Sequence, residues 1–240
     1  MEAIFYEIIL TFIIFIIGIC HGIAGFGFGL LSIPILTYFY DIKHSIIIAT
    51  YLTFISYLFI IFRSYKSIKI KKNLLTCIFI FIGMAIGIYI FKTIDEKPLK
   101  IITGLTITIF GILLAGNYFP ILGTSPYVKA LFGLSSGTLM TTCGMGGPPI
   151  VVYFSSMKLS VKEFRANILP IFFFMTGIAS IMLGFNDEEI QITIINSIKL
   201  VPSLILGNEL GVKLISKIRI NIFRTLVNFL IILSGLSLII

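Results

Sequence analysis

The chain has 240 residues, of which 58% are hydrophobic and only 12% are charged, and its mean hydropathy is +1.12. That composition excludes a soluble globule, because too few polar side chains remain to cover its surface, so we expect the chain to fold in lipid. The net charge of +8 does not indicate nucleic-acid binding, since the cations cluster at the ends of hydrophobic stretches and no separate basic domain exists.

The first hydrophobic region, Ile4–Tyr40, is too long for one membrane helix. At about 1.5 Å per residue, a straight helix of this length would overrun a hydrocarbon core of about 30 Å. Its glycines and Pro34 therefore predict a break or a re-entrant turn. The start of the chain lacks a basic segment and a small-residue cleavage site before Cys20, so we expect the first span to be retained rather than removed as a signal peptide.

Charge-free stretches of membrane-spanning length follow. They are Ser45–Phe62, Asn73–Phe91, Ile101–Val128, Ala130–Met157 and Ala166–Asn186. The last region, Ile190–Ile240, indicates two further spans joined by a basic turn. The sequence thus predicts an all-α, multi-pass integral protein of the cell membrane with roughly seven to eight transmembrane helices.

The two halves of the chain resemble each other. Shifting the sequence by 115 residues gives nine identities in 28 positions, where roughly two are expected from average composition. The identities include Gly22 on Gly137, Gly29 on Gly144 and Pro34 on Pro149, and the offset becomes 124 further on, where Gly83 and Gly87 meet Gly207 and Gly211. We therefore expect one integral membrane domain made of two repeats, 1–115 and 126–240.

Equivalent loops of the two halves differ in charge. The turn from Arg63 to Lys72 holds five cations and no acid, which predicts a cytoplasmic location. Its counterpart, Asp187–Glu189, contains no cation. The difference indicates that the two repeats have inverted topology, as in many secondary transporters.

Two segments rich in glycine and proline stand at matching positions of the repeats, at Gly22–Pro34 and Gly133–Pro149. At membrane depth such backbone is tolerated only where it faces protein or a water-filled cavity. Broken helices expose N–H groups and helix N-termini that attract anions, so the pair predicts a binding site near the midplane. The predicted anion-binding residues here are Gly25, Gly27, Gly29, Pro34, Thr138, Thr141, Thr142, Gly144, Gly146, Gly147, Pro148 and Pro149.

The upstream glycines also have a structural explanation. Gly18, Gly22, Gly25 and Gly29 are spaced four, three and four apart, which places them on one helix face. Small residues on one face commonly allow membrane helices to pack closely. Packing is therefore the alternative interpretation of these upstream glycines, whereas the later Gly-Gly-Pro-Pro run favours a functional break.

With these motifs, the chain resembles the sulfite exporter TauE/SafE family, also called the 4-toluene sulfonate uptake permease superfamily. The resemblance rests on GIAGFGFGLLSIPIL at Gly22–Leu36, GLSSGTLMTTCGMGGPPIVVYF at Gly133–Phe154, and the later glycine pairs. It implies a membrane transporter of sulfite, thiosulfate, sulfonates or related organic acids. The chain departs from the family at Ala49-Thr50-Tyr51, where an Asn-Lys pair is common, but has Arg165-Ala166-Asn167 at the equivalent place in the second half, so Arg165 and Asn167 join the candidate site.

Three ionisable residues inside or beside the spans have two interpretations each. Arg165 is either a membrane-surface anchor or a planar donor for a sulfo or carboxylate group. Glu209 is either a proton-coupling group or a partner of Lys213 four residues later, and His21 is either a proton relay or a hydrogen-bonded helix contact.

We therefore predict a secondary transporter that carries a small anion by alternating access around the paired breaks, with the lipid bilayer and the anion as its partners. An anion channel would share these features and remains an alternative. A redox carrier using Cys20 or Cys143 is disfavoured, because these cysteines align with Ser135 and Phe28 rather than with each other. No enzyme motif, metal site or cofactor site is predicted, and oligomeric state is not indicated by the sequence.

Overall fold

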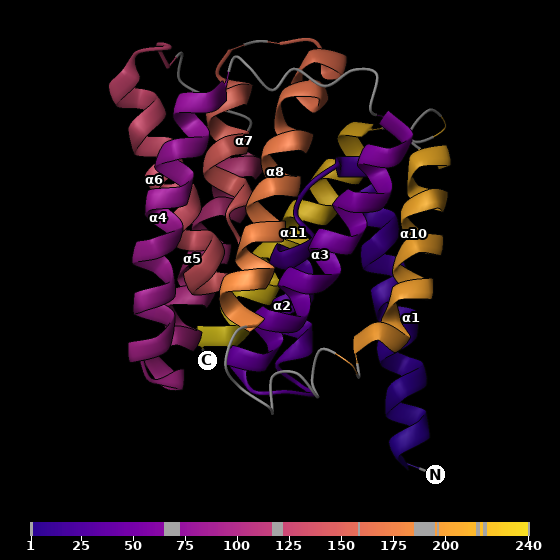
Figure 1. Ribbon diagram of the computed structural model, residues 1–240. Coiled ribbons are helices and arrows are strands. Elements are labelled where there is room, and N and C mark those ends of the chain that lie inside the picture. The colour runs from indigo at the N-terminus through magenta and orange to yellow at the C-terminus, as the bar shows by residue number, and fades with distance from the viewer. Residues whose placement is uncertain are drawn as a thin grey trace.

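The computed structural model describes residues 2–64, 73–116, 122–157, 159–184, 195, 197–214, 217 and 220–239, and the described part is helical without a strand. The helices of the first half are α1 (Glu2–Ala24), α2 (Phe28–Leu36), α3 (Ile42–Ser64), α4 (Leu74–Thr93) and α5 (Glu96–Ala115). Those of the second half are α6 (Pro126–Cys143), α7 (Gly147–Ser155), α8 (Val161–Gly184), the 3-10 turn η3 (Ile198–Leu200), α10 (Val201–Leu214) and α11 (Ile220–Ile239). The bundle is shown in Figure 1, where α3 and α8 lie side by side near its centre.

Within these ranges five helices are long and apolar enough to cross a membrane: α1, α3, α4, α5 and α8. The charge-free stretch Ile101–Val128 is not one span, because α5 ends at Ala115 and the next helix begins only at Pro126. The stretch Ala130–Met157 is likewise divided, since glycines separate α6 from α7. The loops on which we based orientation, Lys66–Lys72 and Asp187–Glu189, lie outside the described residues.

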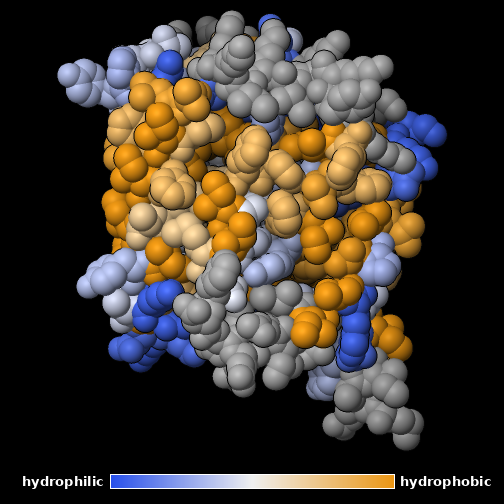
Figure 2. All heavy atoms as spheres, in the orientation of Figure 1, coloured by the Kyte–Doolittle hydropathy of each residue, from blue (hydrophilic) through white to orange (hydrophobic). Residues whose placement is uncertain are grey.

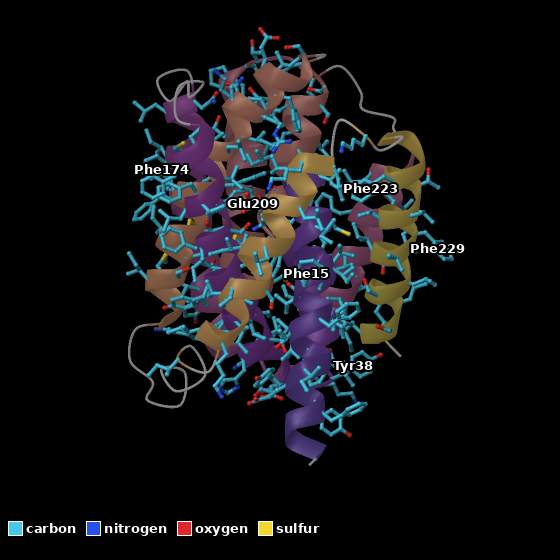
Figure 3. The ribbon with its side chains drawn as sticks, turned by 90° about the vertical axis from the view of Figure 1, so that its right-hand side faces the viewer. Phe15, Tyr38, Phe174, Glu209, Phe223 and Phe229 are labelled. Atoms are coloured by element: carbon cyan, nitrogen blue, oxygen red, sulfur yellow. The ribbon has the colours of Figure 1, made fainter. Side chains whose placement is uncertain are left out.

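The surface of the bundle is apolar around its middle. Figure 2 shows hydrophobic side chains across the mid-height of one face, with hydrophilic groups toward both ends. Phe174 and Phe229 are about half exposed, at 49% and 58%, and point outward on opposite sides of the view in Figure 3. Exposed aromatic side chains at this height are the surface that a lipid-embedded protein presents.

Glycines bring two pairs of helices into close contact. A Cβ added at Gly83 in α4 would overlap the carbonyl oxygen of Leu134 in α6, and one at Gly137 in α6 would overlap that of Ile80 in α4. The same occurs between α1 and α10, where a Cβ at Gly22 would overlap the carbonyl oxygen of Asn208. Backbones this close leave no room for a side chain, so these glycines serve packing, as one of the two interpretations of Gly22 predicts.

In both of these helix pairs, α1 with α10 and α4 with α6, the two helices run in the same direction. Along α1 and α10, Phe15 meets Gly207 and Ile19 meets Gly211. Along α4 and α6 the numbers also rise together, because Gly83 meets Leu134 and Gly87 meets Thr138.

By contrast, α3 and α8 run antiparallel. The Tyr51 hydroxyl donates to the Ser180 carbonyl, while the Tyr57 ring lies 5.5 Å from that of Phe172. α5 and α11 are antiparallel as well, since Gly104 meets Gly235 and Gly111 meets Ile231. The C-terminal ends of α3 and α8 consequently lie at opposite ends of the bundle.

Candidate functional site

The first break lies between α1 and α2. Gly25 and Gly27 have φ of 78° and 88°, a left-handed conformation that side chains with a Cβ rarely adopt, and this ends α1 and starts α2 in a new direction. No side chain caps the N-terminus of α2 at Gly27, so the first N–H groups of that helix are not satisfied by a cap. Figure 1 shows α2 in the lower half of the bundle.

The second break lies between α6 and α7. Gly144 has φ of 68°, and Pro148 and Pro149 fall at the start of α7, where proline is compatible with a helix. Beneath the turn, the Ser136 hydroxyl donates to the Gly146 carbonyl and holds the break in place. Figure 1 shows α7 in the upper half of the bundle, opposite α2.

The two breaks meet at the centre of the protein. A Cβ added at Gly29 would lie 2.7 Å from the Gly144 carbonyl oxygen, and one at Gly144 would lie 2.9 Å from Cδ1 of Ile33. The two glycine-proline segments therefore meet in the structure, and α2 and α7 start on either side of the same point.

A small cavity lies where the breaks meet. Its empty space is about 330 Å³, including the part that opens outward. From the two breaks it is lined by Gly27, Phe28, Gly29, Leu30, Gly144, Met145, Gly146, Gly147 and Pro148. The surrounding helices contribute Thr53, Tyr57, Met140, Phe172, Met175 and Thr176. The N-terminal residues of α2 and α7 thus line one shared cavity.

Three predicted donors do not line this cavity. Thr138, Thr141 and Thr142 donate to the carbonyls of Gly83, Met84 and Gly87 in α4, at 3.1, 2.8 and 3.1 Å. A hydroxyl has one proton to donate, so in this conformation these side chains join α6 to α4 and are not donors for an anion.

Arg165 reaches the first break from α8. Its guanidinium carbon lies 3.6 Å from the position of a Cβ on Gly25, although Arg165 is not among the residues that line the cavity. Tyr57 connects the cavity to the first break, because its ring lines the cavity and its hydroxyl donates to the Gly25 carbonyl at 3.3 Å. No acidic side chain within the described ranges forms an ion pair with Arg165. A partly buried cation beside a helix break is suited to an anion.

His21 lies one turn before Gly25 and is 1% exposed. Its Nδ1 makes a 2.7 Å hydrogen bond with the Ser56 hydroxyl, and the Asn208 amide donates to the same hydroxyl at 2.7 Å. Both His21 Nε2 and Asn208 Oδ1 are buried without a hydrogen-bond partner. The ring of Tyr57 is 5.0 Å from the His21 ring, which connects this polar cluster to the Arg165 region.

The other candidates lie away from the cavity. Glu209 forms a 3.2 Å ion pair with Lys213, as one of its two interpretations predicts, and Figure 3 places it at mid-height on α10. Asn167 accepts a hydrogen bond from Asn73 and donates to the Glu163 carbonyl, so it joins α8 to the start of α4. Pro34 lies inside α2 and Pro149 inside α7, and neither lines the cavity.

The sequence did not identify the lining residues on α3 and α8. Tyr57 and Phe172 are one repeat offset of 115 apart, and their rings meet at the cavity. That equivalence is the signal that would have found them. The cysteines are free thiols, and no cluster of metal-ligating side chains occurs in the parts of the chain that were searched.

Comparison with known proteins identifies the family of the chain. The profile described as Sulfite exporter TauE/SafE matches residues 10–238. No curated protein and no solved structure matches the chain. Because the profile spans nearly the whole chain and five helices are able to cross a membrane, this is a membrane protein that belongs to the sulfite exporter TauE/SafE family of transporters.

Proposed function

We propose that the protein is a secondary transporter of a small sulfur-containing anion, such as sulfite, thiosulfate or a sulfonate, which binds between the two helix breaks. The observation that supports this most directly is the shared cavity at the starts of α2 and α7, with Arg165 beside the first break. Helix N-termini supply partial positive charge without a buried cation, and a guanidinium adds a bidentate donor that matches a sulfo group.

The binding site has unequal halves. Prolines at the start of α7 remove two N–H groups, whereas Phe28, Gly29 and Leu30 at the start of α2 retain theirs. Arg165 also lies on the α2 side, at Gly25. We therefore assign the anion's charged oxygens to the α2 side and its less polar part to Met145, Phe172 and Met175.

The proposal includes two inverted repeats, 1–115 and 126–240. Its support is helix direction: α3 and α8 are equivalent in the two halves and run antiparallel, which repeats of the same orientation would not give. The pair α1 with α10 also corresponds to the pair α6 with α4, and both are parallel. In this arrangement the broken segments α1–α2 and α6–α7 enter the membrane from opposite sides and turn back where the two breaks meet.

These pairings suggest how access alternates. Glycine contacts hold each long arm of a broken segment to a helix of the other repeat, so α1 moves with α10 and α6 moves with α4. Between them, α3 and α8 meet through aromatic contacts, including Phe54 on Phe173 at 5.5 Å. We propose that the two glycine-packed pairs rock about α3 and α8 and open the cavity to one side at a time.

Counterflow in liposomes tests this function. Purified protein is reconstituted into vesicles loaded with unlabelled thiosulfate, and entry of radiolabelled thiosulfate is measured. A transporter gives saturable entry that internal thiosulfate accelerates, whereas a channel gives neither property. We expect Arg165→Gln to abolish counterflow and Lys92→Gln, which removes an exposed cation from α4, to retain it. Counterflow at the wild-type rate in Arg165→Gln would reject the proposed site.

A further inference from the structure

The buried cluster around His21 has no role in the anion site described above. It consists of His21 from α1, Ser56 from α3 and Asn208 from α10, all of which are fully or almost fully buried. Buried polar atoms nearly always have partners, so the two unpartnered atoms, His21 Nε2 and Asn208 Oδ1, require an explanation.

The cluster has acceptor capacity for a protonated histidine. An imidazolium donates from both ring nitrogens. Ser56 Oγ is already in hydrogen-bond contact with Nδ1, and Asn208 contributes a buried carbonyl oxygen that has no donor. A neutral ring, which has only one N–H, leaves part of this capacity unused.

In the described part of the chain, the side chains in contact with His21 are uncharged and do not offset the charge of an imidazolium. From α3 it is faced by Ser56 and Tyr57, from α10 by Asn208, and from α2 by the Phe28 ring. Arg165, a cation, lies beside Gly25, one helical turn after His21. Glu209, the next residue after Asn208, is in an ion pair with Lys213.

A bound anion reverses this balance. Arg165 and His21 are connected through Gly25, whose N–H donates to the His21 carbonyl at 2.7 Å and whose own carbonyl accepts from Tyr57. An anion on Arg165 would neutralise the opposing charge and stabilise an imidazolium one helical turn away. The anion and the proton then bind reciprocally. If the bound anion raises the affinity of His21 for the proton, the bound proton raises the affinity of the site for the anion by the same factor.

We propose that the protein carries a proton together with its anion, and that His21 is the residue that holds this proton. The inference rests on the proposed anion site and adds its coupling ion. The proton comes from solvent and binds the free ring nitrogen of His21 when the anion binds beside Arg165, and both leave together on the other side. Of the two proton-coupling candidates in the sequence, His21 is therefore preferred to Glu209.

Calorimetry on the purified protein tests the proposal. Thiosulfate is the probe, because it does not itself take up a proton near neutral pH, and its binding heat is measured in buffers of different ionisation enthalpy. We expect wild-type protein to take up about one proton per anion and its affinity to fall about tenfold for each unit of rising pH. His21→Gln should bind thiosulfate without proton uptake and without pH dependence.

Two variants separate coupling from folding. His44→Gln changes the other histidine, which bonds Asp41 in an exposed turn, and should behave as wild type. Asn208→Asp adds a carboxylate beside His21, so the ring is protonated before the anion arrives and uptake on binding should fall toward zero while binding persists. Thiosulfate binding without proton uptake in wild-type protein would overturn this inference alone, and absence of anion binding would overturn the proposed function as well.

Discussion

Hydroxyl groups inside this bundle serve two different purposes. Thr142 donates to the Gly87 carbonyl and so joins α6 to α4, whereas Ser56 belongs to the polar cluster around His21. From sequence both are hydroxylated residues in apolar spans, and the partner that distinguishes them comes from another helix. Residue type therefore placed Thr142 among the predicted anion donors and gave no role to Ser56.

Thr142→Val is expected to lower stability and leave anion affinity unchanged. The substitution keeps the shape of the side chain but removes one hydrogen bond and leaves the Gly87 carbonyl without it, which costs about 1 kcal/mol. Thermal unfolding in detergent and thiosulfate titration measure the two effects separately. A selective loss of affinity would show instead that this hydroxyl contacts the anion.

Gly147→Val is expected to have the opposite effect. Gly147 lines the cavity, and an added Cβ would meet only Cζ of Phe172, at 3.7 Å, so the variant should fold while its side chain occupies the anion's space. Thiosulfate affinity should fall at least tenfold with an unchanged unfolding midpoint. Gly146→Val is a poorer test, because its Cβ would lie 2.6 Å from the Met175 sulfur and 2.7 Å from the Ser136 carbonyl oxygen.

At the scale of elements, glycine spacing predicted both the breaks and the close helix packing. The density of glycine and proline at Gly25–Pro34 and Gly144–Pro149 indicated breaks because few other residues tolerate the backbone required there. The partners of the packing glycines were not predictable, because a small-residue face does not specify which helix it meets. The stretch Ile101–Val128 was interpreted as one span because hydropathy does not reveal where a helix ends.

Gly137→Val is expected to reduce the yield of folded protein strongly. Its Cβ would overlap the Ile80 carbonyl oxygen, so α6 and α4 would have to separate. The matched control is Gly123→Val, since no atom lies within 4 Å of a Cβ there. Monodisperse protein recovered by size-exclusion chromatography measures the effect, and equal recovery of the two variants would disprove the close contact.

At the scale of the whole molecule, the antiparallel course of α3 and α8 supports the inverted topology that loop charge suggested. The loops themselves lie outside the described residues, so their positions remain a prediction. Cysteines introduced at Ser67 and Asn186, in a background lacking Cys20, Cys77 and Cys143, should react with a membrane-impermeant reagent from opposite sides. Labelling of both from the same side would contradict the inverted repeats.

The central claim is that a small anion binds where the two helix breaks meet. An experimentally determined structure of the protein with bound thiosulfate tests it most directly. We expect density for the anion between Gly27–Leu30 and Gly144–Pro148, with its charged oxygens toward the first break and Arg165. Thiosulfate bound elsewhere, with the two breaks still packed against each other, would contradict the claim.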